Sequence, residues 1–305
     1  MMAGKRFDVV GLGQCSFDIL GHCGQFPGVD QKTELDQLTH QGGGPVATAL
    51  VALSRLGAGV AFCGRTGDDE YGDRIRQGLQ AEGVDCTSLL VGQNATSQVA
   101  FIAVEETGCR NIFWHRGTAE PLSRDELDPD LIGSCRILHL DGLQHEASLA
   151  AAHLAREQGV VTVLDGGSVR DGTLELLPWI DHPVVSEKFS EQLLPGGSVQ
   201  QKLERLLSFG AVAATVTLGA QGSWSCQREG KPFHQPAFTV DTVDTTGCGD
   251  VFHGAYIYGL LNGWELVRIA RFSAAAAALK SRQLGGRSAI PNLNELMLYL
   301  NVNKS

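Results

Sequence analysis

The segment 243–254 concentrates residue types that could bind an anion and move a proton. Gly247 and Gly249 lie where an extended run at 239–243 gives way to apolar residues at helical spacing. A helix start offers unpaired backbone N–H groups and the positive end of a dipole, and glycines let an anion approach closely. Asp250 falls in the first helical turn. It either caps the helix and compensates its dipole, or acts as a general base beside a phosphoryl group.

The other candidate residues follow predicted strands. Because the carboxyl ends of parallel strands share one edge of a sheet, side chains at these positions converge on one crevice. These positions are Asp18, Asp141, Asp165, Ser186–Glu187, Thr217–Gly219 and Asp244–Asp250. Asp18 reads either as a turn residue or as an acceptor for a polyol. The glycines 42–44 before a helix are either a plain connector or room for a ligand.

This set of residues favours phosphoryl transfer to a hydroxyl. That reaction needs an anion cradle, a carboxylate base, a divalent cation and the exclusion of water. The chain has no G-x-S-x-G elbow, P-loop, H-E-x-x-H or protein-kinase motif set. A G-x-G at Gly11–Gly13 invites a dinucleotide-binding interpretation, but the third glycine and a following helix are missing.

The elements that must position these residues alternate between strands and helices, which predicts an α/β fold with a doubly wound, mostly parallel sheet. Strands are expected at 7–12, 60–63, 137–140, 160–164, 184–185 and 212–218. A helix is expected at 46–56, and a second one is expected to end near Gly83. Further helices are expected at 147–158, 187–194, 199–209, 248–262, 264–282 and 292–301. A hairpin at 98–104 and 109–114, with an exposed strand at 33–40, predicts a small second sheet. A further hairpin is expected at 224–227 and 233–238.

Composition narrows the class of protein. The chain has 305 residues, 43% of them hydrophobic, and a formal net charge of −10 without a basic run, which argues against a partner that is a nucleic acid or an anionic membrane. Eight scattered cysteines without a C-x-x-C pair indicate reduced thiols and a cytoplasmic protein. No signal-peptide pattern or membrane-spanning run is expected.

Four ordered motifs resemble those of the ribokinase-like (PfkB) carbohydrate kinases. Asp244–Asp250 resembles the D-T-x-G-A-G-D signature, and Gly43–Gly57 resembles the N-terminal di-glycine motif. Gly64–Gly72 resembles G-x-x-G-D-D-x-x-G, and Thr217–Gly222 resembles the T-x-G-x-x-G nucleotide loop. The resemblance covers nearly the whole chain. It implies one ribokinase-like domain over 1–305, with a small β-sheet lid formed by segments at about 14–42 and 87–116.

The resemblance also implies roles for individual residues. Asp250 would be the base, and Gly247, Cys248 and Gly249 would form the anion hole. The sugar would be bound by Asp18, Lys32, Gly43, Gly44, Thr48 and Asp141, and ATP by Ser186, Thr217, Gly219 and Gly222. A potassium ion would be bound near Asp244, Thr246 and Ser288 of the 285–288 loop.

Three departures from the family pattern bear on these roles. Cys248 replaces the usual alanine, Thr48 replaces a frequent asparagine, and Ser186–Phe189 replaces an N-x-x-E that supports magnesium through water. Glu187 is the expected substitute for that magnesium contact. Other segments resemble the ketohexokinase and sulfofructose kinase branches, but Trp114 and Leu143 stand where a sulfonate would need polar or basic groups.

We therefore expect an ATP-dependent kinase that phosphorylates a hydroxyl, in the first instance a primary hydroxyl, of a small sugar, with ketoses among the candidates. ATP and Mg²⁺ are the expected cofactors, with K⁺ as a third candidate, and a homodimer formed through the lid is the expected assembly. A nucleoside kinase of the same fold is the main alternative. A sugar or nucleotide sensor without turnover, and a dehydrogenase, are the others.

Overall fold

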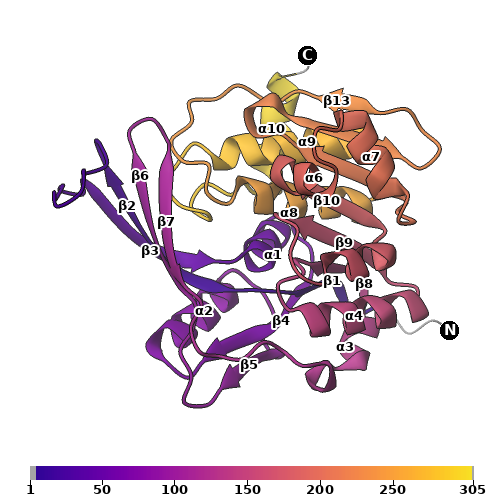
Figure 1. Cartoon of the computed structure of the whole chain (residues 1–305), viewed down its shortest axis with the longest axis horizontal. Coiled ribbons are helices and arrows are strands. Elements are labelled where there is room, and N and C mark those ends of the chain that lie inside the picture. Colours follow the sequence, from indigo (N-terminus) through magenta and orange to yellow (C-terminus); the bar gives the residue numbers. More distant parts are fainter. Residues whose placement is uncertain (1–4, 304–305) are drawn as a thin grey trace.

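The computed structural model describes residues 5–303, and a nine-stranded sheet runs through its centre (Figure 1). The strand order is β13-β12-β11-β10-β9-β8-β1-β4-β5. All neighbours from β11 to β5 pair in parallel, whereas β12 and β13 are antiparallel. The strands are β1 (Phe7–Leu12), β4 (Val60–Gly67), β5 (Leu89–Gly92), β8 (Cys135–Leu140), β9 (Val161–Gly166), β10 (His182–Ser186), β11 (Ala213–Thr217), β12 (Ser223–Gln227) and β13 (Phe233–Gln235).

Helices cover both faces of this sheet, because its strands bury apolar side chains on both sides. Val9 packs into one core and its neighbour Val10 into the other, as the two-residue period of a strand requires. The first core gathers α1 (Pro45–Arg55), α2 (Glu70–Ala81), α8 (Cys248–Leu261), α9 (Leu266–Lys280) and α10 (Leu293–Val302). The second gathers α3 (Pro129–Gly133), α4 (His145–Glu157), α5 (Thr173–Leu176), α6 (Glu187–Leu193) and α7 (Val199–Leu207). The predicted doubly wound fold is confirmed.

A separate four-stranded sheet of order β3-β2-β6-β7 projects from one side of the body (Figure 1). Its strands are β2 (Ser16–Cys23), β3 (Gln37–Gly43), β6 (Val99–Glu105) and β7 (Arg110–His115). We call this sheet the lid. The hairpin expected at 98–114 is therefore present.

Three local expectations differ from the structure. Asp18 lies within β2, a strand that the sequence did not reveal, and not in a turn after β1. Within the segment 87–116, β5 pairs with β4 in the large sheet, so only the later part of that segment builds the lid. Residues 239–243 form no strand, and instead the N–H groups of Val243 and Asp244 donate to the Ser281 carbonyl. Among residues 5–303, no helix has the length and apolar character to cross a membrane.

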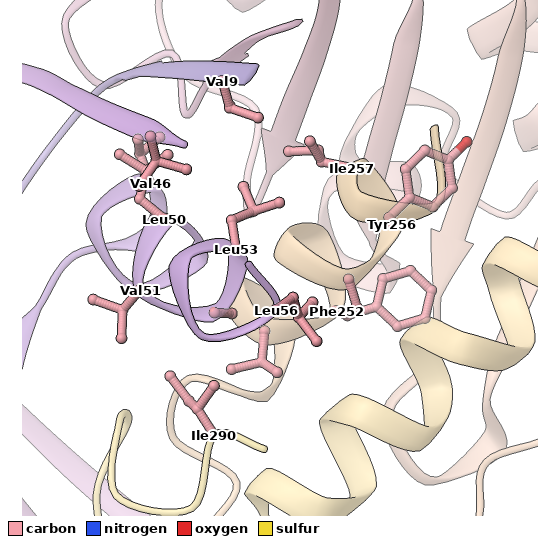
Figure 2. Packing of buried hydrophobic residues seen from close by; sticks show 14 of the residues in the cluster. Val9, Val46, Leu50, Val51, Leu53, Leu56, Phe252, Tyr256, Ile257 and Ile290 are labelled. Atoms are coloured by element: carbon pink, nitrogen blue, oxygen red, sulfur yellow. The ribbon is translucent and has the colours of Figure 1, made fainter. Parts of the chain in front are cut away.

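Close contact between α1 and α8 fixes the helix that carries the glycine-rich segment. Leu50 and Leu53 of α1 and Phe252 and Ile257 of α8 belong to the same buried cluster, the first core (Figure 2). Gly254 allows this approach, since a Cβ atom there would lie 2.6 Å from the Ala49 carbonyl oxygen and 2.9 Å from Ala52 Cβ. The start of α8 is thereby anchored against a buried helix.

Replacing Gly254 with alanine should therefore destabilise the fold. We expect Gly254→Ala to lower the free energy of unfolding by about 1–3 kcal/mol, the usual cost of overpacking, as measured by urea denaturation. Gly78→Ala in α2 is the matched control, because no atom lies within 4 Å of a Cβ atom at that position. The control should stabilise the fold by up to about 1 kcal/mol through helix propensity. Equal effects of the two substitutions would contradict the packing account.

Candidate active site

The N-terminus of α8 lies open at the carboxyl edge of the large sheet. Gly247, its N-cap residue, has a φ of 76° and no side chain that could satisfy the first N–H groups. A Cβ atom at Gly247 would lie 2.7 Å from the Gly286 carbonyl oxygen, so this turn packs directly on the loop after α9. Gly249 is exposed, and Asp250 lies in the first turn. The Cys248 N–H donates to the Thr245 carbonyl oxygen at 3.2 Å, and no side chain caps the helix start that carries Asp250.

Asp250 belongs to a group of carboxylates at this edge. Burial raises the pKa of Asp250 well above its usual value, and the charges of Asp165 and Asp18 raise it further. Arg287 and Lys280 act in the opposite direction. A raised pKa brings a carboxylate closer to the range in which a general base works efficiently.

Arg287 is the residue that the sequence analysis did not place in the site. Its side chain is buried, with Nη2 3.0 Å from the Gly43 carbonyl oxygen and Nε 3.3 Å from Thr48 Oγ1. Its backbone N–H donates to Gln41 Oε1 at 2.7 Å. Gly42 makes room for the guanidinium, since a Cβ atom there would collide with Nη1. The sequence signal for this contact is a pair of glycine clusters, at 42–44 and 285–286, with Arg287 directly after the second.

Arg287 changes how the predicted sugar-binding residues are placed. Thr48 is 1% exposed and its hydroxyl accepts the Arg287 N–H group, so it supports the arginine. Asp18 accepts a hydrogen bond from Ser16 Oγ at 2.7 Å, and burial raises its pKa, while Ser16 and Arg287 oppose the shift. A Cβ atom at Gly43 would collide with the Asp18 carboxylate. These side chains come together as the sequence predicts.

Asp141 connects the large sheet to the start of the lid. Its carboxylate accepts the N–H groups of Gln14 at 2.8 Å and Leu143 at 2.9 Å. Burial raises the pKa of Asp141 to about 7, although these two N–H groups oppose the shift. Asp141 follows β8, where Leu140 pairs with Leu164, so its neighbour across the sheet edge is Asp165.

His253 and Asp165 form a buried pair below Asp250. The His253 ring nitrogens lie 2.7 Å from the Gly249 carbonyl oxygen and 2.9 Å from the Val184 carbonyl oxygen. The Asp165 carboxylate also lies 3.4 Å from Nδ1 of the same ring. This pair holds the first turn of α8 against β9 and β10.

The predicted ATP-binding residues share the neighbouring part of the edge. Ser186 ends β10 and pairs in register with Thr217 at the end of β11. Ser186 caps α6 by accepting the Phe189 N–H group, and its hydroxyl donates to the Gly167 carbonyl oxygen at 2.8 Å. Gly219 and Gly222 both have positive φ, and a Cβ atom at Gly222 would collide with the backbone of β13. The backbone conformation of this loop therefore favours glycine at both positions.

The chain matches proteins of one known family over nearly its whole length. The model of the pfkB family carbohydrate kinases matches residues 6–293. The chain belongs to the pfkB family of carbohydrate kinases. The kinase is 31% identical to the ribokinase of Haemophilus influenzae (strain ATCC 51907 / DSM 11121 / KW20 / Rd), covering 85% of this chain and 87% of the relative. It is 26% identical to the 5-dehydro-2-deoxygluconokinase of Shouchella clausii (strain KSM-K16), covering 96% and 95%. A solved structure of a putative ribokinase from Agrobacterium tumefaciens superposes with a TM-score of 0.92 at 27% identity, covering 99% and 100%.

Two predicted site residues of the kinase are exposed, and a third carries a thiol. Lys32 is exposed on the loop between β2 and β3, and Ser288 is exposed after the buried Arg287. Cys248 points its thiol toward the Ala277 carbonyl oxygen at 3.5 Å, and burial raises its pKa to about 11. A neutral thiol is a poor nucleophile, so Cys248 acts here as a small side chain in the turn.

The electrostatics predict an acid limb in the activity of the kinase. Because the base must be ionised, kcat/KM should fall as pH drops through the raised pKa of Asp250. Asp165→Asn removes one of the charges that raise this pKa, so the acid limb should move toward lower pH. The measurement is kcat/KM as a function of pH, with Glu229→Gln in the exposed hairpin turn as control. An unchanged limb in Asp165→Asn would contradict the coupling.

Proposed function

We propose that this chain is an ATP-dependent sugar kinase in which Asp250 takes the proton from a substrate hydroxyl. The observation that carries the proposal is the open N-terminus of α8, with Asp250 in its first turn facing the crevice of buried carboxylates and Arg287. A base and an anion cradle on one helix turn are what transfer of a phosphoryl group to an alcohol requires.

The residues of this chain would divide the work as follows. Asp250 would orient the hydroxyl and accept its proton, while the N–H groups of residues 247–249 would stabilise charge on the transferring γ-phosphoryl group. Asp18 and Asp141 would bind sugar hydroxyls, and the loop from Thr217 to Gly222 would hold the nucleotide. Closure of the site around the bound substrates would keep water from competing with the sugar.

Mg²⁺ fits the same edge of the sheet. Carboxylate oxygens and water are its preferred ligands, and Glu187 is exposed in the first turn of α6, beside the Ser186 and Thr217 strand ends. The ion would neutralise charge on the ATP phosphates. In support, a structure of the same fold from E. coli, a putative ribokinase II, was solved in complex with ATP and Mg²⁺. It has a TM-score of 0.86 and 23% identity, and covers 97% of this chain and 99% of that one.

The substrate is proposed as a small sugar with a primary hydroxyl, with ketoses included. The family resemblance supports a sugar, whereas a nucleoside kinase of the same fold is the competing proposal. A thermal-shift panel of ketoses, aldoses, sugar acids and nucleosides, followed by ADP-release assays, separates the two, because a ligand that binds only the native state raises the melting temperature. Release of ADP only with nucleosides would overturn the sugar assignment. We also place the kinase in the cytoplasm, consistent with its free thiols, and cell fractionation tests this.

Removal of the proposed base gives the most direct test of mechanism. Asp250→Asn should retain the fold and the sugar-induced thermal shift, because its shape is conserved. Its kcat should fall by about two to four orders of magnitude, the range for loss of a general base. Steady-state kinetics and thermal shift on the same sample measure both effects. Near-normal turnover in the variant would reject Asp250 as the base.

We further propose a homodimer that forms through the lid. Phe101 of β6 and Phe113 of β7 are directly paired on one face of the lid, and they are 38% and 64% exposed. β3 and β7 are also edge strands of the lid. An exposed apolar face bounded by free strand edges favours association with a second copy.

A charge on this face should therefore separate the two copies. Phe113→Asp should elute as a monomer in size-exclusion chromatography with light scattering, whereas the unmodified chain should elute as a dimer. Val302→Asp is the control, because Val302 is 83% exposed on α10 in the body. A dimer that persists in Phe113→Asp, or that is lost equally in the control, would contradict an interface on the lid.

A further inference from the structure

Lys280 is a fully buried lysine close to the start of α8. It is the last residue of α9, with an exposed fraction of 0%. Its Nζ lies 3.0 Å from the backbone carbonyl oxygen of Asp244. Burying an ammonium group is costly unless nearby groups compensate its charge. The groups around Lys280 must therefore compensate the charge of its ammonium.

Those surroundings are the loop that the family resemblance assigned to potassium. Asp244 is fully buried, and its Oδ1 accepts both the N–H and the hydroxyl of Thr246 at 2.8 and 2.7 Å. Its Oδ2 accepts the Gly285 N–H at 2.8 Å. The Lys280 ammonium takes the carbonyl oxygen of the same residue. The Asp244 carboxylate thus accepts hydrogen bonds from Thr246 and Gly285, and its carbonyl oxygen accepts one from the Lys280 ammonium.

A potassium ion does not fit this donor set. An alkali cation needs several oxygens to replace its hydration shell. Here each Asp244 oxygen already accepts a donor, Thr246 Oγ1 is turned toward that carboxylate, and Ser288 is exposed. A second cation beside the Lys280 ammonium would also be repelled by it.

We propose that the Lys280 ammonium takes the place of the alkali cation expected at this loop, so that the kinase needs no potassium. Lys280 would then be a positioning residue. It holds the Asp244 carbonyl oxygen and, through Asp244, the turn from Thr246 to Gly247 that begins α8. Its charge adds to the positive end of the helix dipole under the anion hole.

The neighbouring charges are consistent with an ammonium. The carboxylates of Asp244 and Asp250 both act on the Lys280 ammonium as opposite charges. The Lys280 charge acts on Asp250 in the same way. The ammonium and these carboxylates therefore stabilise each other.

The test compares K⁺ with tetramethylammonium, a cation too large for such a site. The unmodified chain should show the same melting temperature in both salts. Its turnover in the two salts should agree within about twofold. Lys280→Met removes the charge and keeps a side chain of similar length. It should melt lower and gain a K⁺-dependent rise in melting temperature, because loss of the ammonium frees the Asp244 carbonyl oxygen and removes the repulsion that opposes K⁺ binding to the native state. Lys280→Gln provides a second variant if the first does not fold.

Lys202→Met is the matched control. Lys202 is 7% exposed in α7 and is paired with Glu191, far from Asp244 in the sequence. Its loss should lower the melting temperature without creating a response to K⁺. The proposal rests on the proposed function only for the turnover reading, because the thermal reading needs no substrate. A K⁺-dependent rise in the unmodified chain would overturn it. Absence of any K⁺ response in both Lys280 variants would also overturn it, since Lys280 would then stand at no cation site.

Discussion

The carboxylate of Asp244 ties the start of α8 to the loop after α9. It accepts hydrogen bonds from Thr246 on one side and from Gly285 on the other. This connection brings the Gly286 backbone against Gly247 and places Arg287 beside the crevice. The conformation of the turn before α8, the buried arginine and the position of Asp250 all depend on this buried aspartate.

Charge balance explains why the crevice can hold so many acidic groups. Four carboxylates, those of Asp18, Asp141, Asp165 and Asp250, lie at or near one edge of a chain whose net charge is −10. Uncompensated, they would repel an approaching ATP molecule. Arg287, Lys280 and the positive end of the α8 dipole oppose this accumulation of negative charge around Asp250.

The sequence predicted the parts of the site that depend on local chemistry. Strand periodicity predicted the parallel sheet, and glycines before an apolar helical pattern predicted the helix start that carries Asp250. Arg287 and Lys280 escaped because neither is part of a local pattern. Arg287 is explained only by glycines about 240 residues earlier in the chain, and Lys280 reads as an ordinary basic residue at a helix C-terminus. Their roles come from tertiary contacts.

Other differences have the same origin. β2 follows β1 after a short connection, and its mixed sequence Ser16–Cys23 does not alternate clearly, so pairing with β3 and β6 decides its structure. β5 was assigned to the lid because chain order places it before β6, whereas hydrogen bonding places it beside β4. In both cases a partner strand, and not the segment itself, determines the sheet.

The lid touches the catalytic loop through two different strands. The Arg287 guanidinium donates to the Gly43 carbonyl oxygen at the end of β3, and Arg110 of β7 donates to Thr245 Oγ1. Any swing of the lid relative to the body must break these bonds or carry the loop with it. The position of the lid and the conformation of this loop are therefore coupled through two hydrogen bonds.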